Sequence, residues 1–262
     1  MSAGRDGVRI TVLGSGTSVG VPTIGCRCAV CRSQDLRDAR LRPSVLVSYG
    51  GHKVLIDASP DLRQQALRAD LDRLDAILFT HAHADHILGL DDVRPFNYQR
   101  RDPLPVYGSP ETLAVIRSTF SYIFDGRPTE SSVPRIEARP LSGGPLDLFG
   151  LEFRPVPVWH GKSEIYGFRF GAAAYLTDNS EIPENSLALL SGLDVLFLDA
   201  LRHRPHATHS TVATALKNVE RLAPRRAFFT HIGHELPHEE TERQLPPHVR
   251  LAYDGLDVEV EG

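Results

Sequence analysis

One short segment of the chain concentrates side chains that bind metal ions. Residues 80–86 read Thr-His-Ala-His-Ala-Asp-His and bring His81, His83, Asp85 and His86 together. Neutral imidazole and carboxylate are ligands that divalent zinc, manganese and iron share. In an extended stretch His81 and His83 point the same way and can reach one ion, and a turn into a helix at Asp85 would direct Asp85 and His86 toward a second. The segment predicts a metal site, and a merely polar loop is the alternative.

A second segment offers soft ligands. Cys26, Cys28 and Cys31 lie within Gly-Cys-Arg-Cys-Ala-Val-Cys at positions 25–31, and they are the three cysteines of the chain. Three thiolates at this density are typical of a closed structural zinc site that lacks only its fourth ligand. An odd number of cysteines in one place suits metal binding in a reducing compartment better than a disulfide framework. Buried or redox-active cysteines are the alternative.

Strands and helices must position these residues. Apolar runs rich in β-branched residues predict strands of two sheets, and helical periodicity predicts helices that cover the outer faces. The expected strands are Val8–Leu13, Ser44–Tyr49, Lys53–Asp57, Ala76–Thr80, Leu151–Val158, Tyr166–Phe170, Ala173–Thr177, Val195–Asp199 and Ala227–Thr230, and the expected helices are Ser59–Arg68, Pro110–Thr119, Glu184–Leu190 and Ser210–Leu222. His81, His160, Asp178 and His231 each follow such a strand end, where folds of this class build reactive clefts.

The motif and the later residues together resemble the metallo-β-lactamase superfamily, whose pattern is His-x-His-x-Asp-His followed by lone His, Asp and His residues. The resemblance covers nearly the whole chain, because Asp57 also matches a family position. It implies an α/β fold, an αββα sandwich of two mixed sheets flanked by helices. It further implies one metal on His81, His83 and His160, a second on Asp85, His86 and His231, and Asp178 bridging the two.

The cysteine segment narrows the resemblance. Gly-Ser-Gly-Thr-Ser, the cysteine run and Thr-His-Ile-Gly-His-Glu are similar to the phosphoribosyl cyclic phosphate phosphodiesterases of phosphonate breakdown, whereas tRNase Z proteins lack this zinc. His234 is the expected fourth zinc ligand, because it lies three residues after His231 and one loop could serve both sites. His238 is a competing candidate. Such a zinc would hold the N-terminal loop against the rim of the active site.

These residues imply a hydrolytic mechanism. Two divalent ions, zinc or manganese, would activate a bridging water for attack on phosphorus, with Asp85 in the catalytic set. The departing alkoxide needs a proton, and we expect His209 to supply it, since its segment resembles the His-Ser-Thr region of phosphodiesterases in the superfamily. His206 is the alternative acid. We expect Asp57 to hydrogen-bond a ligating imidazole, and Arg94 is a weaker candidate for a phosphate contact.

Composition limits the partners and the location. The 262 residues carry a formal net charge of -4, which favours a small anionic substrate over a long nucleic acid. We find no apolar stretch that could span a membrane and no signal peptide, so we expect a cytoplasmic protein without a membrane partner. The absence of linkers and repeats predicts a single domain over residues 1–262 with a structural zinc loop near 25–31, and a homodimer is left open.

The expected function is hydrolysis of a small or cyclic phosphodiester, such as a phosphoribosyl cyclic phosphate, by a binuclear metal-dependent phosphodiesterase. One alternative is a tRNase Z-like RNA endonuclease, although the chain shows no long Gly/Pro-rich arm and is acidic. Another is a non-phosphodiesterase role like that of pyrroloquinoline quinone biosynthesis proteins, which resemble this branch. Ligands alone do not identify the substrate, because the pocket wall decides it.

Overall fold

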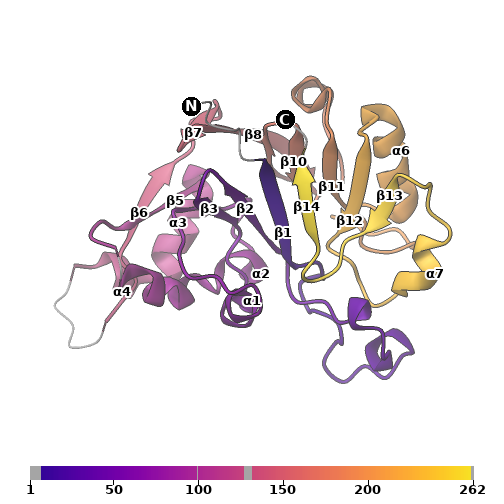
Figure 1. Ribbon diagram of the computed structural model, residues 1–262, viewed down its shortest axis with the longest axis horizontal. Coiled ribbons are helices and arrows are strands. Elements are labelled where there is room, and N and C mark those ends of the chain that lie inside the picture. The colour runs from indigo at the N-terminus through magenta and orange to yellow at the C-terminus, as the bar shows by residue number, and fades with distance from the viewer. Residues whose placement is uncertain (1–6, 99, 127–131, 261–262) are drawn as a thin grey trace.

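The strands form two mixed sheets that pack face to face. The computed structural model describes residues 7–98, 100–126 and 132–260, and within these residues each sheet has seven strands (Figure 1). The first sheet runs in the order β14 (Asp257–Val260), β1 (Val8–Gly14), β2 (Ser44–Tyr49), β3 (His52–Ile56), β4 (Ala76–Leu78), β5 (Leu104–Gly108) and β6 (Ile136–Pro140). The second runs β13 (Val249–Leu251), β12 (Arg226–Thr230), β11 (Val195–Asp199), β10 (Ala173–Leu176), β9 (Ser163–Phe170), β8 (Leu151–His160) and β7 (Leu146–Leu148).

Each sheet combines a parallel and an antiparallel half. Strands β3 to β6 are parallel, as are β10 to β13, whereas β14, β1, β2 and β3 pair antiparallel and so do β7 to β10. The carboxyl ends of parallel strands lie at one edge of a sheet, where loops can present side chains to a common cleft. The αββα sandwich of two mixed sheets that the resemblance implied is confirmed.

Helices cover the two outer faces. The α-helices are α1 (Leu62–Arg68), α2 (Ala84–Ile87), α3 (Pro110–Thr119), α4 (Ser121–Phe124), α5 (Glu184–Leu187), α6 (Val212–Leu222) and α7 (His238–Glu242), and the 3₁₀ helices are η1 (Val30–Arg32), η2 (Leu36–Asp38), η3 (Leu90–Asn97) and η4 (Ala188–Leu190). None of the helices in the described part of the chain has the length and apolar character needed to cross a bilayer.

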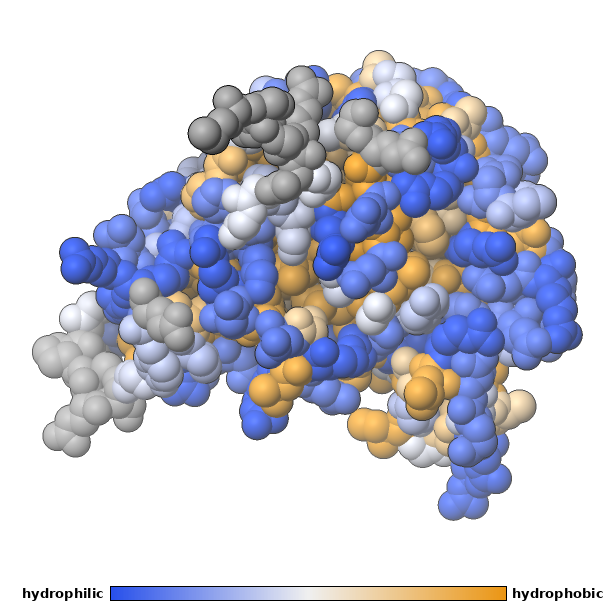
Figure 2. Space-filling model, in the orientation of Figure 1, coloured by the Kyte–Doolittle hydropathy of each residue, from blue (hydrophilic) through white to orange (hydrophobic). Residues whose placement is uncertain are grey.

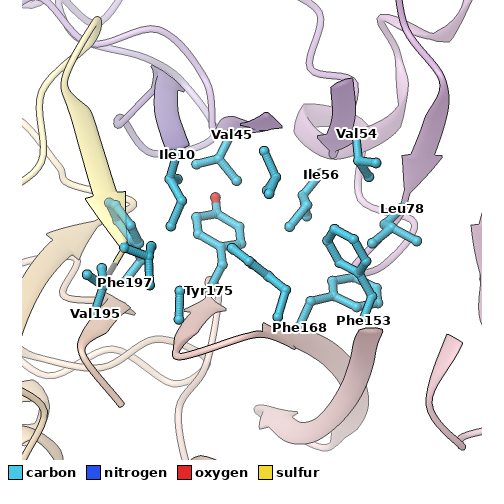
Figure 3. Packing of buried hydrophobic residues seen from close by; sticks show 14 of the residues in the cluster. Ile10, Val45, Val54, Ile56, Leu78, Phe153, Phe168, Tyr175, Val195 and Phe197 are labelled. Atoms are coloured by element: carbon cyan, nitrogen blue, oxygen red, sulfur yellow. The ribbon is translucent and has the colours of Figure 1, made fainter. Parts of the chain in front are cut away.

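The core has three layers, as the sandwich requires. Between the sheets, aliphatic residues of the first sheet such as Ile10 and Ile56 meet aromatic residues of the second such as Phe168 and Tyr175, all buried (Figure 3). Two further apolar clusters seal the first sheet against α1, η3 and α3, and the second sheet against α5 and α6. Burial on both faces explains why the central strands are almost continuously apolar.

A segment before β2 projects from the sandwich and carries the cysteines. It appears at the lower right of Figure 1, below α7, and the same region of Figure 2 shows apolar atoms at the surface. Val19, Ile24 and Leu36 in this segment are exposed, Ile24 almost completely. A loop so poor in buried apolar contacts needs another source of order, which the cysteine cluster described below can provide.

Candidate metal centre

The ends of strands from both sheets bring the expected ligands to one place. His231 directly follows β12, Asp178 follows β10 by two residues, and the motif from His81 onward follows β4. The sequence analysis expected His160 to follow a strand. It is instead the last residue of the antiparallel strand β8. The short helix α2 begins at Ala84 and turns Asp85 and His86 away from His83, in agreement with the expected change of direction.

The donor atoms fall into two groups that share one carboxylate. One group comprises His81, His83, His160 and Asp178, and the other comprises Asp85, His86, Asp178 and His231; within each group the donor atoms lie within 4.8 Å of one another. The Asp178 carboxylate lies 3.2 Å from His86 Nε2 and 3.3 Å from His231 Nε2. Two ligands bound to a tetrahedral ion at about 2.0–2.1 Å lie about 3.3–3.4 Å apart, so this spacing fits a cation between them.

The hydrogen bonding of these atoms also fits cations. His81 Nε2, His86 Nε2, His231 Nε2 and one Asp85 oxygen are buried and have no hydrogen-bond partner. His86 Nε2 nevertheless lies 3.3 Å from Asp85 Oδ2. Buried polar atoms are nearly always paired, so lone pairs that converge without pairing indicate a place for a positive ion. The seven side chains could therefore hold two divalent ions.

Asp57 fixes the orientation of one imidazole in each group. Its carboxylate, fully buried after β3, accepts hydrogen bonds from the Thr80 backbone N–H and hydroxyl and from His86 Nδ1, each at 2.8 Å. The Thr80 oxygen in turn lies 3.0 Å from His81 Nδ1. With the protons held at Nδ1, the Nε2 atoms of His81 and His86 keep the lone pairs that a metal needs. The expected role of Asp57 agrees with this geometry.

Burial and neighbouring carboxylates shift the pKa values of the histidines in the two groups. Burial lowers the pKa of His81. Burial acts the same way on His86 and His231, but Asp178 and the neighbouring carboxylates outweigh it, raising the pKa of His86 well above its usual value and that of His231 to about 9. The carboxylates therefore favour positive charge at this place, as a divalent cation site requires.

His209 stands beside the two groups. Its Nδ1 lies 2.9 Å from a carboxylate oxygen of the fully buried Asp199, and its ring stacks on His231 with centroids 4.6 Å apart. It also lies 4.8 Å from the His160 ring. His206, by contrast, is exposed and contacts Thr208. His209 therefore contacts a member of each donor group, whereas the ring of His206 lies beside that of His209, with centroids 5.0 Å apart. The sequence analysis did not assign a role to Asp199, which is the last residue of β11, as His160 is the last residue of β8.

The sulfur atoms of Cys26, Cys28 and Cys31 lie close to the imidazole of His234. Its Nδ1 lies 3.2 Å from the Cys26 sulfur and 3.5 Å from those of Cys28 and Cys31. Tetrahedral zinc with Zn–S of about 2.3 Å and Zn–N of about 2.05 Å would separate sulfur and nitrogen by about 3.6 Å, so the four residues fit one ion. His238, the competing candidate, is buried elsewhere, with its backbone N–H bonded to Asp38 and its ring near Glu242.

A cavity of about 550 Å³ opens beside the first group. It is lined by Thr80, His81, Ala82, His83, Ser109, Glu111, Thr112, Val115, His160, Ser163, Glu164, Ile165 and Tyr166. This volume lies within the range of small-molecule sites. Sequence reasoning missed the wall contributed by α3 and β9, because its residues carry no motif. Arg94 does not line this cavity; it pairs with Asp91 at 2.7 Å and borders a separate one.

Comparisons with known proteins agree with this architecture. A family model described as beta-lactamase superfamily domain matches residues 52–232. The crystal structure of a diphosphatase from the PhnP family is 54% identical, with a TM-score of 0.91 and coverage of 96% of each chain. Zinc-bound PqqB from Methylobacterium extorquens, at 21% identity and a TM-score of 0.78 over 96% of this chain and all of that chain, shares the fold.

A curated relative shows how far the similarity extends. An octanoyltransferase of Porphyromonas gingivalis is 38% identical over 259 residues, which are 97% of this chain and 52% of that protein. The chain spans about half the length of the first curated relatives that it matches. The family match covers strands of both sheets and all seven donors, so the chain belongs to the beta-lactamase superfamily and has the metallo-β-lactamase fold, with high similarity to a member of the PhnP family.

Proposed function

We propose that the protein is a binuclear metal-dependent phosphodiesterase that hydrolyses a small or cyclic phosphodiester. The observation that carries the proposal is the convergence of seven buried or cleft-lining donors in two groups that share Asp178. The high identity to a diphosphatase of the PhnP family supports phosphorus chemistry, since hydrolysis of a phosphodiester or a diphosphate in each case breaks a P–O bond. We do not base the proposal on the octanoyltransferase name, because this chain matches about half of that protein.

The residues around the two donor groups have separate roles in the proposed reaction. When bound, a pair of divalent ions supplies Lewis acidity that makes water acidic and polarises the phosphoryl oxygens. Asp178 would neutralise part of their charge, because its carboxylate belongs to both donor groups. Asp57 and Thr80 keep His81 and His86 in the ligating tautomer.

His209 handles the leaving group. The alkoxide that departs from an alkyl phosphodiester has a pKa far above neutrality, so it leaves readily only when it is protonated. The Asp199 carboxylate accepts a hydrogen bond from His209 Nδ1, which leaves Nε2 free to donate to the departing oxygen. Ring contacts of His209 with His160 and His231 support this role, because these two histidines belong to the two donor groups.

The Cys26, Cys28, Cys31 and His234 cluster would hold a zinc ion with a structural role. Backbone N–H donation from Cys31 lowers the pKa of the Cys28 thiol to about 6, which favours the thiolate that zinc binds. His234 and His231 belong to one loop, so order in the cluster is also order in the catalytic loop. Elemental analysis after treatment with a thiol reagent would identify this ion separately.

The test is hydrolysis of bis(p-nitrophenyl) phosphate by protein loaded with zinc or manganese. We expect turnover that needs the metal and is lost in Asp85→Ala, whereas Asp102→Ala, which removes an exposed carboxylate outside the site, leaves it intact. Equilibrium metal analysis should give a pair of chelatable ions in addition to the thiol-bound one. Absence of turnover on several diesters with both metals would refute the proposal, and tight, salt-sensitive tRNA binding in a gel shift would favour an RNA substrate.

A further inference from the structure

The buried histidines among the expected metal ligands differ in how their Nδ1 atoms are held. In three of them Nδ1 lies 3.0 Å or less from an oxygen atom, and the pairs are His81 with Thr80, His86 with Asp57 and His160 with Thr208. His231 is the exception. Its Nε2 lies 3.3 Å from Asp178, whereas its buried Nδ1 has no hydrogen-bond partner within the described residues. A ligating imidazole almost always donates its second N–H to a carboxylate, a carbonyl or a water.

A carboxylate oxygen near His231 also lacks a partner. Asp199 is fully buried at the end of β11, and its Oδ2 accepts hydrogen bonds from His209 Nδ1 at 2.9 Å and from the Ser210 backbone N–H at 3.3 Å. Its Oδ1 is buried and has no partner in the part of the chain that the structure describes. A carboxylate oxygen of Asp199 and a ring nitrogen of each of His209 and His231 lie within 4.8 Å of one another. An unpaired acceptor and an unpaired donor therefore belong to side chains that approach closely.

The Thr230 hydroxyl is a third unpaired atom at this place. Asp199 and Thr230 are Cα partners at the ends of the parallel strands β11 and β12, so their side chains lie on the same face of the second sheet. Two residues earlier on these strands, Phe197 and Phe228 stack in the core between the sheets, which places Asp199 and Thr230 on the face turned toward the first sheet. Thr230 directly precedes His231, and its Oγ1 is buried without a hydrogen-bond partner among the described residues.

Three buried polar atoms of complementary character therefore belong to neighbouring positions at the ends of two strands. A buried water typically makes about three hydrogen bonds to such groups. Two hydrogen bonds of about 2.8 Å that meet at a water oxygen join atoms about 4.6 Å apart. This length agrees with the limit of 4.8 Å between the Asp199 and His231 ligand atoms. A single water can thus connect the groups that no direct hydrogen bond joins.

We infer that Asp199 Oδ1, Thr230 Oγ1 and His231 Nδ1 bind one ordered water, which holds His231 in the tautomer that ligates a metal through Nε2. The water accepts a hydrogen bond from His231 Nδ1, donates one to Asp199 and forms a third with the Thr230 hydroxyl. Asp199 and Thr230 are then positioning residues for His231, as Asp57 is for His86. Because the other oxygen of Asp199 accepts from His209, the water also links a ligand of the second group to the proposed proton donor.

The first experiment compares two substitutions of Thr230. Thr230→Val removes the hydroxyl and keeps the branched shape, whereas Thr230→Ser keeps the hydroxyl. We expect Thr230→Val to weaken zinc binding at the chelatable sites about three- to tenfold in competition with a chromophoric chelator, the effect of losing one hydrogen bond. Thr230→Ser should restore binding to the wild-type value. Thr241→Val is the matched control, because Thr241 is a buried threonine on α7 outside both donor groups, and it should bind zinc as the wild type does.

Two further readouts use the zinc-loaded wild-type protein. A crystal structure should place a water within hydrogen-bond distance of Asp199 Oδ1, Thr230 Oγ1 and His231 Nδ1. ¹⁵N NMR should show the proton of His231 on Nδ1, in slow exchange with solvent, and the exchange should be faster in Thr230→Val. Both wild-type readouts decide the inference even where a variant does not fold.

The inference is overturned if Thr230→Val and Thr241→Val bind zinc equally well, or if Thr230→Ser binds as weakly as Thr230→Val. A zinc-loaded structure in which His231 Nδ1 donates to a protein group and not to a water would also overturn it. None of these measurements needs a substrate. Failure of the inference is therefore distinguishable from failure of the proposed phosphodiesterase activity, which the diester assays test.

Discussion

The substitution Asp57→Asn tests whether one buried carboxylate sets the tautomers of ligands in both metal groups. An asparagine can still accept the hydrogen bond from the Thr80 backbone N–H with its remaining oxygen. Its amide NH₂ would then face the Thr80 hydroxyl and His86 Nδ1, both of which lie 2.8 Å from the oxygen that is replaced. Two donors in contact in a buried site cost about 1–3 kcal/mol.

His86 can relieve this contact by moving its proton from Nδ1 to Nε2, which removes the lone pair that a metal needs. Thr80 must also reorient, and its oxygen lies 3.0 Å from His81 Nδ1, so the first group is disturbed as well. We expect metal affinity to fall about ten- to hundredfold, the range found when partners of ligating histidines are replaced.

The assay is competition for metal against a chromophoric chelator, combined with ¹⁵N NMR of the histidine tautomers. Asp75→Asn is the control, because Asp75 also accepts a backbone N–H bond, from Lys53 at 2.8 Å, but at the opposite end of β3. The reasoning is wrong if Asp57→Asn binds metal within about threefold of the control, because a tenfold loss is the smallest expected.

Further outcomes follow from other contacts. His209→Ala should slow hydrolysis of alkyl diesters about 10²–10⁴-fold, but that of p-nitrophenyl diesters less than about tenfold, because p-nitrophenolate leaves without a proton; equal losses in steady-state kinetics would exclude the proton-donor role. In protein that keeps its thiol-bound zinc, metal binding at neutral pH should release protons from His86 and His231. The release should diminish as the pH rises through about 9, the raised pKa of His231. Calorimetric heats of metal binding that do not depend on the ionisation enthalpy of the buffer would contradict this prediction. Arg40→Met leaves buried Asp38 without its ion-pair partner and should lower the free energy of unfolding by about 3 kcal/mol in urea denaturation. Arg135→Met, which changes an exposed residue, should lower it by less than about 1 kcal/mol. Similar losses in both variants would show that the Arg40 contacts add little stability.

The sequence predicted most of the buried strands well. The strands Ser44–Tyr49 and Val195–Asp199 and the helix Pro110–Thr119 have the predicted bounds, because apolar runs and a Ser-Pro start are strong local signals. Sequence reasoning missed β5, which contains Pro105 and ends at Gly108, and it missed β6, β7, β13 and β14. β6 and β14 alternate with polar residues because one face is exposed, and β7 and β13 have three residues each, which is too short for a periodic signal.

For the site, local sequence patterns identified the metal ligands but not the residues that surround them. The motif and the strand-end residues identified all seven side chains that the structure brings together. Asp199 and the cavity wall were missed because their roles depend on packing between distant segments. Glu111 on α3 and Glu164 on β9, for example, are far apart in the sequence but line the same cavity. No spacing in the sequence encodes that proximity.

The sequence identifies the ligands but does not predict the backbone conformation at the strand ends that carry them. Asp57, Asp178 and His231 all adopt the left-handed conformation, with φ of 64°, 57° and 57°. Such a conformation favours glycine and costs other residues about 1 kcal/mol each. Glycine would offer no donor atom, so a site that needs a carboxylate or imidazole where the chain leaves the sheet must accept this cost. The hydrogen bonds of Asp57 offset this cost at that position, and metal binding would offset it at Asp178 and His231. Local propensity therefore favours a different backbone from the one that the chemistry requires.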